Sequence, residues 1–365
     1  MPIAELGYRA WQGRRLGPWR RWLAITRMHV GVALRSSKLL RRFLFVAWSP
    51  LLYFGPVFFA VGWVANPAND LSQGGLMTSI AREVLLGPSI LDQLRATPGT
   101  FLPAMWAVAF YFFFSLTQTF CMLVVIAIVA PPLIARDVQS KAFLLYLSKP
   151  ISALEYLAGK LGAVLFFVFA ITLFPALVLY AISISLCPDL GIALATTPIL
   201  LRIVGASLAM GIPVAMVALL LSSSTRSHRV AMFGWIAVCL FGEIAYRSIA
   251  FGGAAGGTFA PVWAPFLSLR EVAIMASSTV FDVGGQLTAV ITKLREGGGD
   301  IDALLRPLAR DFEPGSPVRN AILHSTGDGA VSDTLPAWAS LAFLAAVTVV
   351  SGAIVLRRIT KPVRI

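Results

Sequence analysis

The chain has 365 residues, of which 58% are hydrophobic and 13% charged, and its mean hydropathy is +0.80. Soluble domains are nearer half apolar and a quarter charged, and several uncharged runs are too long for a soluble core. Continuous apolar runs cross lipid as helices, so the composition predicts an all-α polytopic membrane protein. The net charge of +13 gathers beside these runs, which argues against nucleic acid as a partner.

Residues 1–42 form a basic arm in which Glu5 is the only acid. Basic residues recur on one helical face at Arg20, Arg27, Arg35, Lys38 and Arg42, with Trp22, Ile25, Val32 and Leu40 roughly opposite. This pattern is typical of a helix that lies flat on an anionic membrane surface. A nucleic-acid arm is disfavoured because a membrane span follows at once. A signal peptide is disfavoured because the apolar run 43–65 and the basic segment before it are both too long.

Six membrane spans are predicted, over residues 43–65, 104–134, 156–186, 199–221, 230–251 and 336–356. Pro50 and Pro56 imply a kink in the first span. The second would be roughly 45 Å long against about 30 Å of hydrocarbon, so it must tilt or project into water. Between the first two spans lies a polar connection that could hold a short helix over 76–94. Residues 187–198 are predicted to form a short turn.

The connection between spans two and three, residues 135–155, is specified more sharply than an ordinary loop. Pro131-Pro132 are expected to end the incoming helix, because proline lacks a backbone donor and crowds the preceding turn. Asp137 and Lys141 fall one turn apart and can pair on a short helix. Lys149-Pro150 should break that helix.

Ser152 and Glu155 then form an S-x-x-E capping box, which predicts the start of the next helix. The acid at Asp137, the step Ser140-Lys141, the segment LLYLSKPIS and the following EYLAGK resemble the ABC-2 (type-2) ABC transporter permease family. This chain has Ser140-Lys141-Ala142 where many relatives have a Gly-Thr step. An amphipathic connector lying on lipid is the alternative interpretation of the same residues.

In the family that the motif resembles, this cytoplasmic connection docks on a separate ATPase subunit. The resemblance therefore implies a set of docking and coupling residues, namely Arg136, Asp137, Ser140, Lys141, Leu144, Leu145, Tyr146, Lys149, Pro150, Glu155, Tyr156, Gly159 and Lys160. It also implies a second permease subunit, giving a homodimer or heterodimer. The implied location is the bacterial cytoplasmic (inner) membrane, and the implied direction of transport is export. Lipid, peptide, antibiotic, ion and a role in maturing extracytoplasmic metalloenzymes are all compatible as substrate or task.

No enzymatic site is predicted. Gly159-Lys160 is followed by Leu161, so no phosphate loop is present, and ATP and Mg²⁺ are expected on the partner ATPase rather than on this chain. His29, His228 and His324 show no ligand spacing, and neither a metal nor another cofactor is expected.

The fifth span carries Glu243 and Arg247 at i,i+4, an intramembrane ion pair that is either a functional site or a device that locks a helix. Residues 252–335 after it are predicted to be an extracytoplasmic or interfacial insert. Its opening, including APVWAPFLSL, looks interfacial or re-entrant. Helices are expected over 283–295 and 300–312, with a turn-rich end over 314–333, so that the insert forms a small helical cap.

Basic residues favour the cytoplasmic side of a membrane. They place the arm, the connection 135–155, the turn 222–229 and the tail inside, with both termini cytoplasmic.

Four regions follow, namely the basic arm 1–42, spans one to five over 43–251, the insert 252–335, and span six with its tail over 336–365. A non-transporting scaffold or assembly factor, whose outer segment binds a partner, is the second hypothesis. A secondary transporter is disfavoured because the spans hold few ionisable groups for ion coupling.

Overall fold

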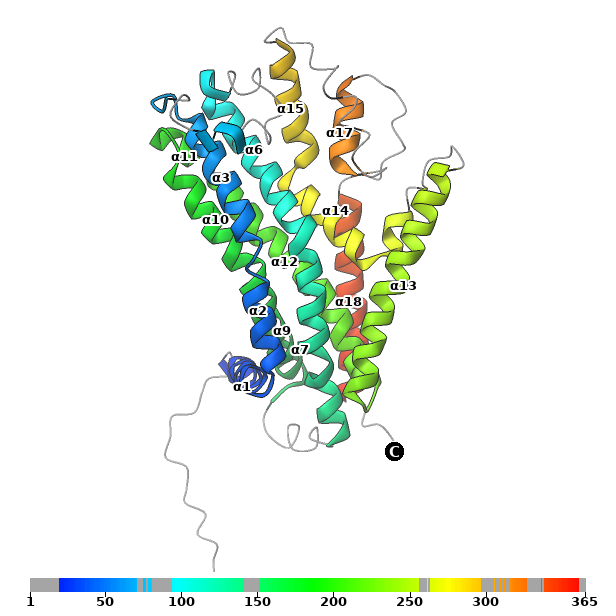
Figure 1. The fold of residues 1–365 in the computed structure, drawn as a ribbon. Helices are drawn as coiled ribbons and strands as arrows, with labels where there is room; N and C mark the ends of the chain where they lie inside the picture. The colour runs from blue at the N-terminus through cyan, green and yellow to red at the C-terminus, as the bar shows by residue number, and fades with distance from the viewer. Residues whose placement is uncertain are drawn as a thin grey trace, which may run out of the picture.

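The computed structural model describes residues 20–70, 75–76, 78–80, 94–140, 151–255, 261, 263–296, 305, 309, 312, 316–326, 336 and 338–360. In this part of the chain every regular element is a helix (Figure 1). Six helical stretches are long and apolar enough to cross a membrane, namely Lys38–Ala65, Phe101–Gln139, Ala153–Ser185, Leu190–Ser224, His228–Ala250 and Trp338–Thr360. The predicted all-α fold with six spans is confirmed.

Most spans are built from more than one helix. The first consists of α2 (Lys38–Val46) and α3 (Leu51–Ala65), and the second of α6 (Pro98–Phe113), the π-helical turn η2 (Phe114–Gln118) and α7 (Thr119–Gln139). The third and fourth consist of α9 (Ala153–Ile171) with α10 (Leu173–Ser185), and α11 (Leu190–Ala195) with α12 (Thr197–Ser224). The fifth and sixth are α13 (His228–Ala255) and α18 (Trp338–Thr360). The expected turn at 187–198 therefore contains a helical piece of its own, α11.

The double proline does not end the second span, contrary to the sequence prediction. Pro131 and Pro132 lie inside α7, which continues to Gln139. The hydroxyl of Ser222 on α12 donates to the carbonyl of Pro131 at 2.7 Å. The Ser222 hydroxyl oxygen also accepts from the backbone N–H groups of Ile134 at 3.2 Å and Ala135 at 3.1 Å. A neighbouring helix thus satisfies backbone groups at the proline pair, which allows the helix to continue.

The basic arm is also divided differently from the prediction. Helix α1 (Arg21–Ser36) ends before Ser37, whose side chain accepts from the N–H of Leu40 and caps α2. Leu40 therefore belongs to the first span and is almost completely buried. Figure 1 shows α1 lying across the end of the bundle, which is the orientation expected of a helix on a membrane surface.

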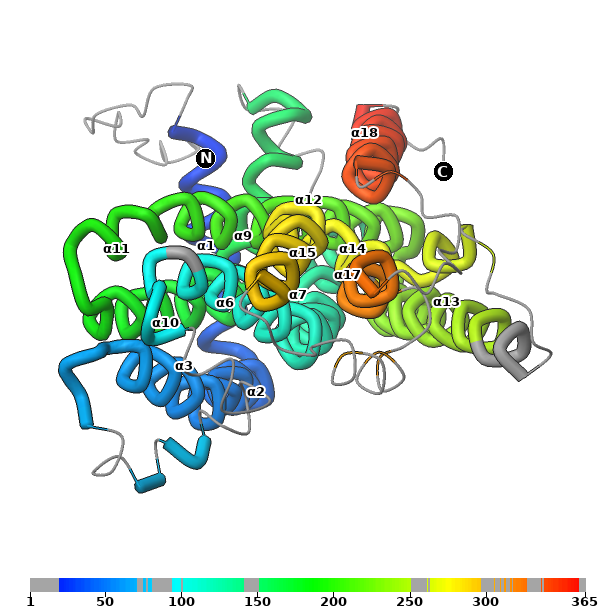
Figure 2. The backbone as a smooth tube through the Cα atoms, turned by 90° about the horizontal axis from the view of Figure 1, so that it is seen from above, coloured from blue at the N-terminus to red at the C-terminus, as the bar shows by residue number. Residues whose placement is uncertain are grey.

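Helix α12 lies at the centre of the bundle and contacts α7, α9, α10, α13, α14 and α18. Seen along the bundle, α2 and α3 lie at one edge of an elongated cross-section and α13 at the other (Figure 2). The start of α1 and the end of α18 lie at the same end of the bundle (Figure 1).

The segment after α13 contains a helix that packs inside the bundle, beside the opening that the sequence predicts to be interfacial or re-entrant. Helix α14 (Leu269–Phe281) packs within the bundle against α12, α13 and α18. It follows the 3-10 turn η3 (Ala264–Leu267) and is joined at 52° to α15 (Val283–Glu296), so the pair forms either a broken span or a re-entrant loop. The α15 helix matches its predicted range closely.

Residues 317–326, predicted to be turn-rich, form a helix, α17 (Pro317–Thr326), that packs against α15. Most of the predicted helices over 76–94 and 300–312 lies outside the described residues.

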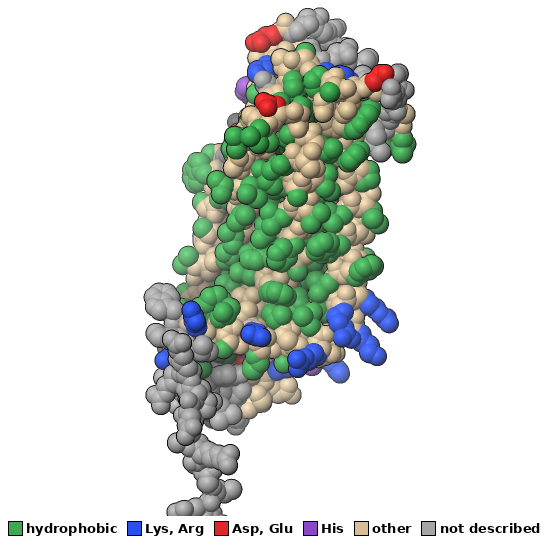
Figure 3. Space-filling view, turned by 90° about the vertical axis from the view of Figure 1, so that its left-hand side faces the viewer, with side chains coloured by type: hydrophobic (Ala, Val, Ile, Leu, Met, Phe, Trp, Pro, Cys, Tyr) green, Lys and Arg blue, Asp and Glu red, His purple; other side chains and the backbone are tan. Residues whose placement is uncertain are grey.

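The described surface is banded. Figure 3 shows hydrophobic side chains covering the middle of the molecule, with most of the visible Lys and Arg at the end where α1 lies. The visible acidic side chains gather mainly at the opposite end. This is the surface expected of a protein whose middle lies in lipid and whose two ends lie in water.

Candidate functional site

Helix α9 begins where the sequence predicts, because Ser152 caps its N-terminus. The Ser152 hydroxyl accepts from the N–H of Glu155 at 3.2 Å, and the Glu155 carboxylate accepts from the N–H of Ser152 at 2.8 Å. This reciprocal capping box is the one predicted, and it fixes the phase of the next turns of α9. As a result Tyr156, Gly159 and Lys160 point inward and are buried.

Lys160 is the centre of a buried polar cluster. Its side chain is 0% exposed, and Nζ lies 2.6 Å from Oδ2 of Asp137, 2.6 Å from the Leu133 carbonyl oxygen and 2.7 Å from Nε2 of His29. The hydroxyl of Tyr156 donates to the same Asp137 oxygen at 2.6 Å. An ammonium group has three donors, and here each has an acceptor. A lysine can be buried at this position because its charge is paired and its hydrogen bonds are made.

The contacts of His29 define its tautomer. Nδ1 lies 2.8 Å from the carbonyl oxygen of Ile25, which can only accept, so Nδ1 carries the proton and donates. Nε2 is then the acceptor for Lys160. Burial, and next the positive charge of Lys160, lower the pKa of His29 below its ordinary value of 6.5. The ring is therefore neutral near pH 7.

The α1 helix reaches this cluster because glycines on α9 let the two helices approach. A β-carbon at Gly159 would lie 2.7 Å from Cβ of Ile25 and 2.9 Å from the carbonyl oxygen of Trp22. One at Gly162 would lie 2.7 Å from Oγ1 of Thr26. Thr26 also donates to the Gly159 carbonyl at 3.0 Å. The glycine of the EYLAGK motif thus serves the packing of α1 on α9.

We call His29, Asp137, Tyr156 and Lys160 the buried junction. It joins α1, α7 and α9 at the basic end of the bundle, immediately on either side of the connection between α7 and α9. The sequence predicts a pair between Asp137 and Lys141, which lies outside the described residues. In the structure the Asp137 carboxylate accepts from Lys160 and Tyr156. The junction therefore holds the end of α7 and the start of α9 in direct contact.

The predicted docking residues fall into three groups. Arg136 and Ser140 are exposed at the end of α7, and Glu155 is partly exposed at the start of α9. Tyr156, Gly159 and Lys160 are buried, and Asp137 is largely so, its side chain being 14% exposed. The remaining residues, Lys141, Leu144, Leu145, Tyr146, Lys149 and Pro150, lie outside the described part of the chain.

A second charged cluster lies between α13 and α14, where the sequence predicts an ion pair. Oε1 of Glu243 accepts from Arg247 at 2.6 Å and from Arg270 at 3.2 Å, and Oε2 accepts from the Ser268 hydroxyl at 2.8 Å. Arg270 also pairs with Glu271. We call these five residues the α13–α14 network. It anchors the start of α14 to α13.

Two further features hold α14 in the bundle. A β-carbon at Gly242 would lie 2.6 Å from the carbonyl oxygen of Leu267, so glycine is needed where the chain returns beside α13. At the other end Arg202 of α12 donates to the Phe281 carbonyl at 2.9 Å, where the C-terminal carbonyls favour a cation. Asp282 then takes a left-handed conformation, with φ of 53°, at the bend into α15.

Sequence reasoning missed several of these residues. Arg202 carries a usable signal, since a charged residue inside an apolar run is a functional candidate. His29 and Ser222 carry none, because single polar residues on long helices do not indicate which neighbour they meet. Within the described residues no group of three or more His, Cys, Asp and Glu side chains could hold a metal ion.

The banded surface and six apolar spans define a multi-pass α-helical membrane protein with a charged junction at its basic end. The sequence profile of the family described as ABC-2 family transporter protein matches residues 68–361, which include five of the six spans. The chain belongs to this family and is the membrane-spanning permease of an ABC transporter. A comparison with curated proteins gave no match.

Proposed function

We propose that the chain is the permease of an exporter and is driven by a separate ATPase subunit docked on the connection 135–155. ATP and Mg²⁺ bind that subunit, and a second permease subunit completes the transporter in a bacterial inner membrane. The observation that carries this proposal is the buried junction. It ties the end of α7 to the start of α9 on either side of the connection, and both to α1.

The junction supports a mechanical role because of where it lies. A chain without a phosphate loop can use ATP only through a contact that moves with the nucleotide cycle of a partner. The Asp137–Lys160 pair is shielded from water, where separating two charges is expensive. A displacement of the connection is therefore passed to α7, α9 and α1 together rather than absorbed between them. Each of α7 and α9 continues directly into a span.

The proposed orientation places the basic end in the cytoplasm. Lys and Arg gather at the end of the bundle where α1 lies, and α18 ends there too (Figures 3 and 1). Cytoplasmic ends of membrane proteins carry such an excess. The connection 135–155 then faces the compartment that holds ATP, and the insert 252–335 reaches the opposite side through α15 and α17.

The apolar and the charged docking residues have different roles. The apolar side chains of Leu144, Leu145 and Tyr146 would bury surface against the ATPase, at roughly 1.5–3 kcal/mol for each large side chain. An exposed ion pair contributes only about 0.2–1 kcal/mol. The apolar residues therefore dominate assembly, while the buried Asp137 and Lys160 act as positioning residues that hold the connection in place.

The test is co-purification of this chain with a co-expressed candidate ABC ATPase subunit. The double variant Leu144→Ser, Tyr146→Ser should insert normally but release the ATPase and lose its stimulated hydrolysis. Leu190→Ser is the matched control, because Leu190 is 74% exposed and lies on α11 at the other end of the bundle. A double variant that still binds a fully stimulated ATPase overturns the docking site. An unaltered chain that binds no ATPase supports the scaffold hypothesis instead.

A further inference from the structure

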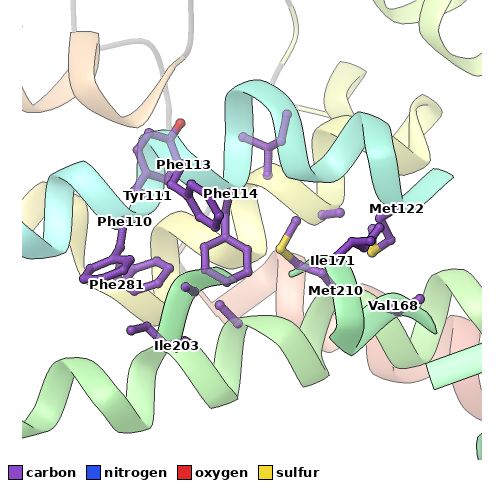
Figure 4. Packing of buried hydrophobic residues seen from close by; sticks show 14 of the residues in the cluster. Phe110, Tyr111, Phe113, Phe114, Met122, Val168, Ile171, Ile203, Met210 and Phe281 are labelled. Carbon is purple, nitrogen blue, oxygen red and sulfur yellow. The ribbon is translucent and has the colours of Figure 1, made fainter. Parts of the chain in front are cut away.

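The buried core of the bundle is mainly apolar. Figure 4 shows aromatic and aliphatic side chains of the core packed together, among them Phe114, Met122, Ile171 and Phe281. A charged ligand placed among such side chains would lose its hydration, which is costly unless charged partners replace the water. A charged ligand is better accommodated at the surface, where Lys and Arg gather along one border of the hydrophobic band (Figure 3).

Helix α2 carries three of the basic residues on one face. Lys38, Arg41 and Arg42 are spaced i, i+3 and i+4, which places them next to one another along the helix. All three are exposed, whereas Leu40 on the other side of the same helix is 1% exposed and belongs to the bundle core. We call Lys38, Arg41 and Arg42 the α2 basic face.

No acidic side chain of the described residues neutralises this face. Residues 20–65 contain neither Asp nor Glu, and in the described part of the chain none of the three basic residues has an ion-pair partner. Arg35, in the last turn of α1, adds a further exposed cation three residues before Lys38. Because like charges repel one another, such a cluster attracts an anionic partner.

The same face of α2 becomes apolar one turn further on. Phe45 follows Arg41 by four residues and Arg42 by three, and it is 84% exposed. Beyond it the first span continues through α3, which carries no charged residue. The face therefore changes from basic to apolar where the helix enters the hydrophobic band. A phospholipid has the same order of groups, since its charged headgroup lies at the membrane surface and its acyl chains lie deeper.

We propose that the α2 basic face binds the headgroup of an anionic phospholipid, with an acyl chain lying along Phe45. The phosphate accepts hydrogen bonds from the ammonium of Lys38 and the guanidinium groups of Arg41 and Arg42. Clusters of Lys and Arg beside a membrane helix attract anionic lipids, and the exposed Phe45 favours a lipid over a soluble anion. The inference holds for either direction of transport and does not require a docked ATPase.

The first test uses the unaltered protein in detergent. Equal amounts of dioleoyl phosphatidylglycerol and dioleoyl phosphatidylcholine are added, and native mass spectrometry counts the lipids that stay bound. The acyl chains are identical, so a difference in retention reports the headgroup. Phosphatidylglycerol should be retained several-fold more than phosphatidylcholine, and an excess of inorganic phosphate should not displace it. Equal retention of the two lipids, or displacement by phosphate, overturns the proposal.

The second test removes the charges of the face in the triple variant Lys38→Gln, Arg41→Gln, Arg42→Gln. Each basic residue near an anionic membrane surface strengthens binding roughly fivefold. The preference for phosphatidylglycerol should therefore fall about tenfold or more. The size-exclusion profile should stay unchanged, because all three side chains are exposed. A triple variant that keeps the preference overturns the proposal.

A matched control removes three charges elsewhere at the same end of the bundle, in the triple variant Arg226→Gln, Arg229→Gln, Arg357→Gln. These arginines are exposed on the turn before α13, on α13 and on α18. The control should keep the preference for phosphatidylglycerol. An equal loss in both triple variants would mean attraction by net charge rather than a site on α2. If the α2 variant instead keeps the lipid preference and releases a co-expressed ATPase, the face is a protein contact and the lipid site is wrong.

Discussion

The buried junction and the α13–α14 network are two charged clusters of similar chemistry in different surroundings. Each is organised by one carboxylate that accepts from more than one donor, Asp137 in the junction and Glu243 in the network. The side chain of Lys160 is 0% exposed, whereas those of Arg247 and Arg270 are 39% and 25% exposed. Exposure at the surface of the bundle is what separates the two clusters.

This difference predicts different mechanical behaviour. In the junction, an ion that loses its partner has no water to replace it. Removing one member of the cluster therefore costs a large part of the folding free energy. In the network, Glu243 accepts from Arg247, Arg270 and Ser268, so the loss of one contact leaves the others in place. The junction therefore suits a rigid connection between α1, α7 and α9, while the network suits a contact between α13 and α14 that can be remade.

The largest expected effect is from breaking the junction on one side. Lys160→Met leaves the Asp137 carboxylate buried without its cation, which should cost about 3–5 kcal/mol of unfolding free energy. The unfolding temperature in detergent measures this loss. Lys38→Met is the matched control, since Lys38 is exposed on α2. The double variant Lys160→Met, Asp137→Leu should recover much of the loss, because it removes both charges. A cost no greater than that of the control would contradict a rigid junction.

A smaller effect is expected in the network. Glu243→Gln keeps the shape of the side chain but removes the charge that Arg247 and Arg270 share, and should cost on the order of 1 kcal/mol. Equal costs of Glu243→Gln and Lys160→Met would abolish the distinction between the clusters.

Features of the two clusters that rest on local rules could be predicted from the sequence. The capping box of Ser152 and Glu155 and the i,i+4 pair of Glu243 and Arg247 each depend on residues within one turn, and both are found as expected. The six spans follow from the lengths of apolar runs. Such features need only the geometry of a single helix.

Contacts between distant segments could not be predicted in the same way. His29 lies 131 positions from Lys160, and Ser222 lies 91 from Pro131. A proline pair predicts a helix end because the sequence alone does not reveal a hydroxyl on another helix that bonds to the backbone beside it. The same limit explains why the sequence offered Lys141, one turn away, as the partner of Asp137.

The helix α14 shows how composition can mislead. Its sequence LREVAIMASSTVF carries two charges and three hydroxyl groups, which favours a place in an extracytoplasmic or interfacial insert. In the structure its serine and threonine hydroxyls donate to carbonyls within the helix, and its Arg270 pairs with Glu271 and with Glu243. Polar side chains whose hydrogen bonds are met locally can enter the bundle.

The smallest expected effect is the pH dependence that His29 gives the junction. Its native pKa lies below the ordinary value of 6.5, because burial and the charge of Lys160 disfavour the imidazolium. An unfolded chain would therefore bind the proton first as the pH falls. The contribution of His29 to stability is complete above pH 6.5 and is lost as the pH falls below that value toward the native pKa. Protonation also removes the lone pair with which Nε2 accepts from Lys160.

The measurement is the unfolding temperature of the unaltered protein and of His29→Gln between pH 7.5 and pH 5, about one and a half units below the ordinary pKa. Gln offers an oxygen near the position of Nε2 but does not titrate. At pH 7.5 the unaltered protein should be the more stable of the two, since its ring is held by Ile25 and Lys160 together. Below pH 6.5 its unfolding temperature should fall more steeply than that of the variant. Other titrating groups are common to both proteins and cancel in the difference. Parallel curves over this range would mean that His29 does not accept from Lys160, and the junction would then be a contact of α7 and α9 alone.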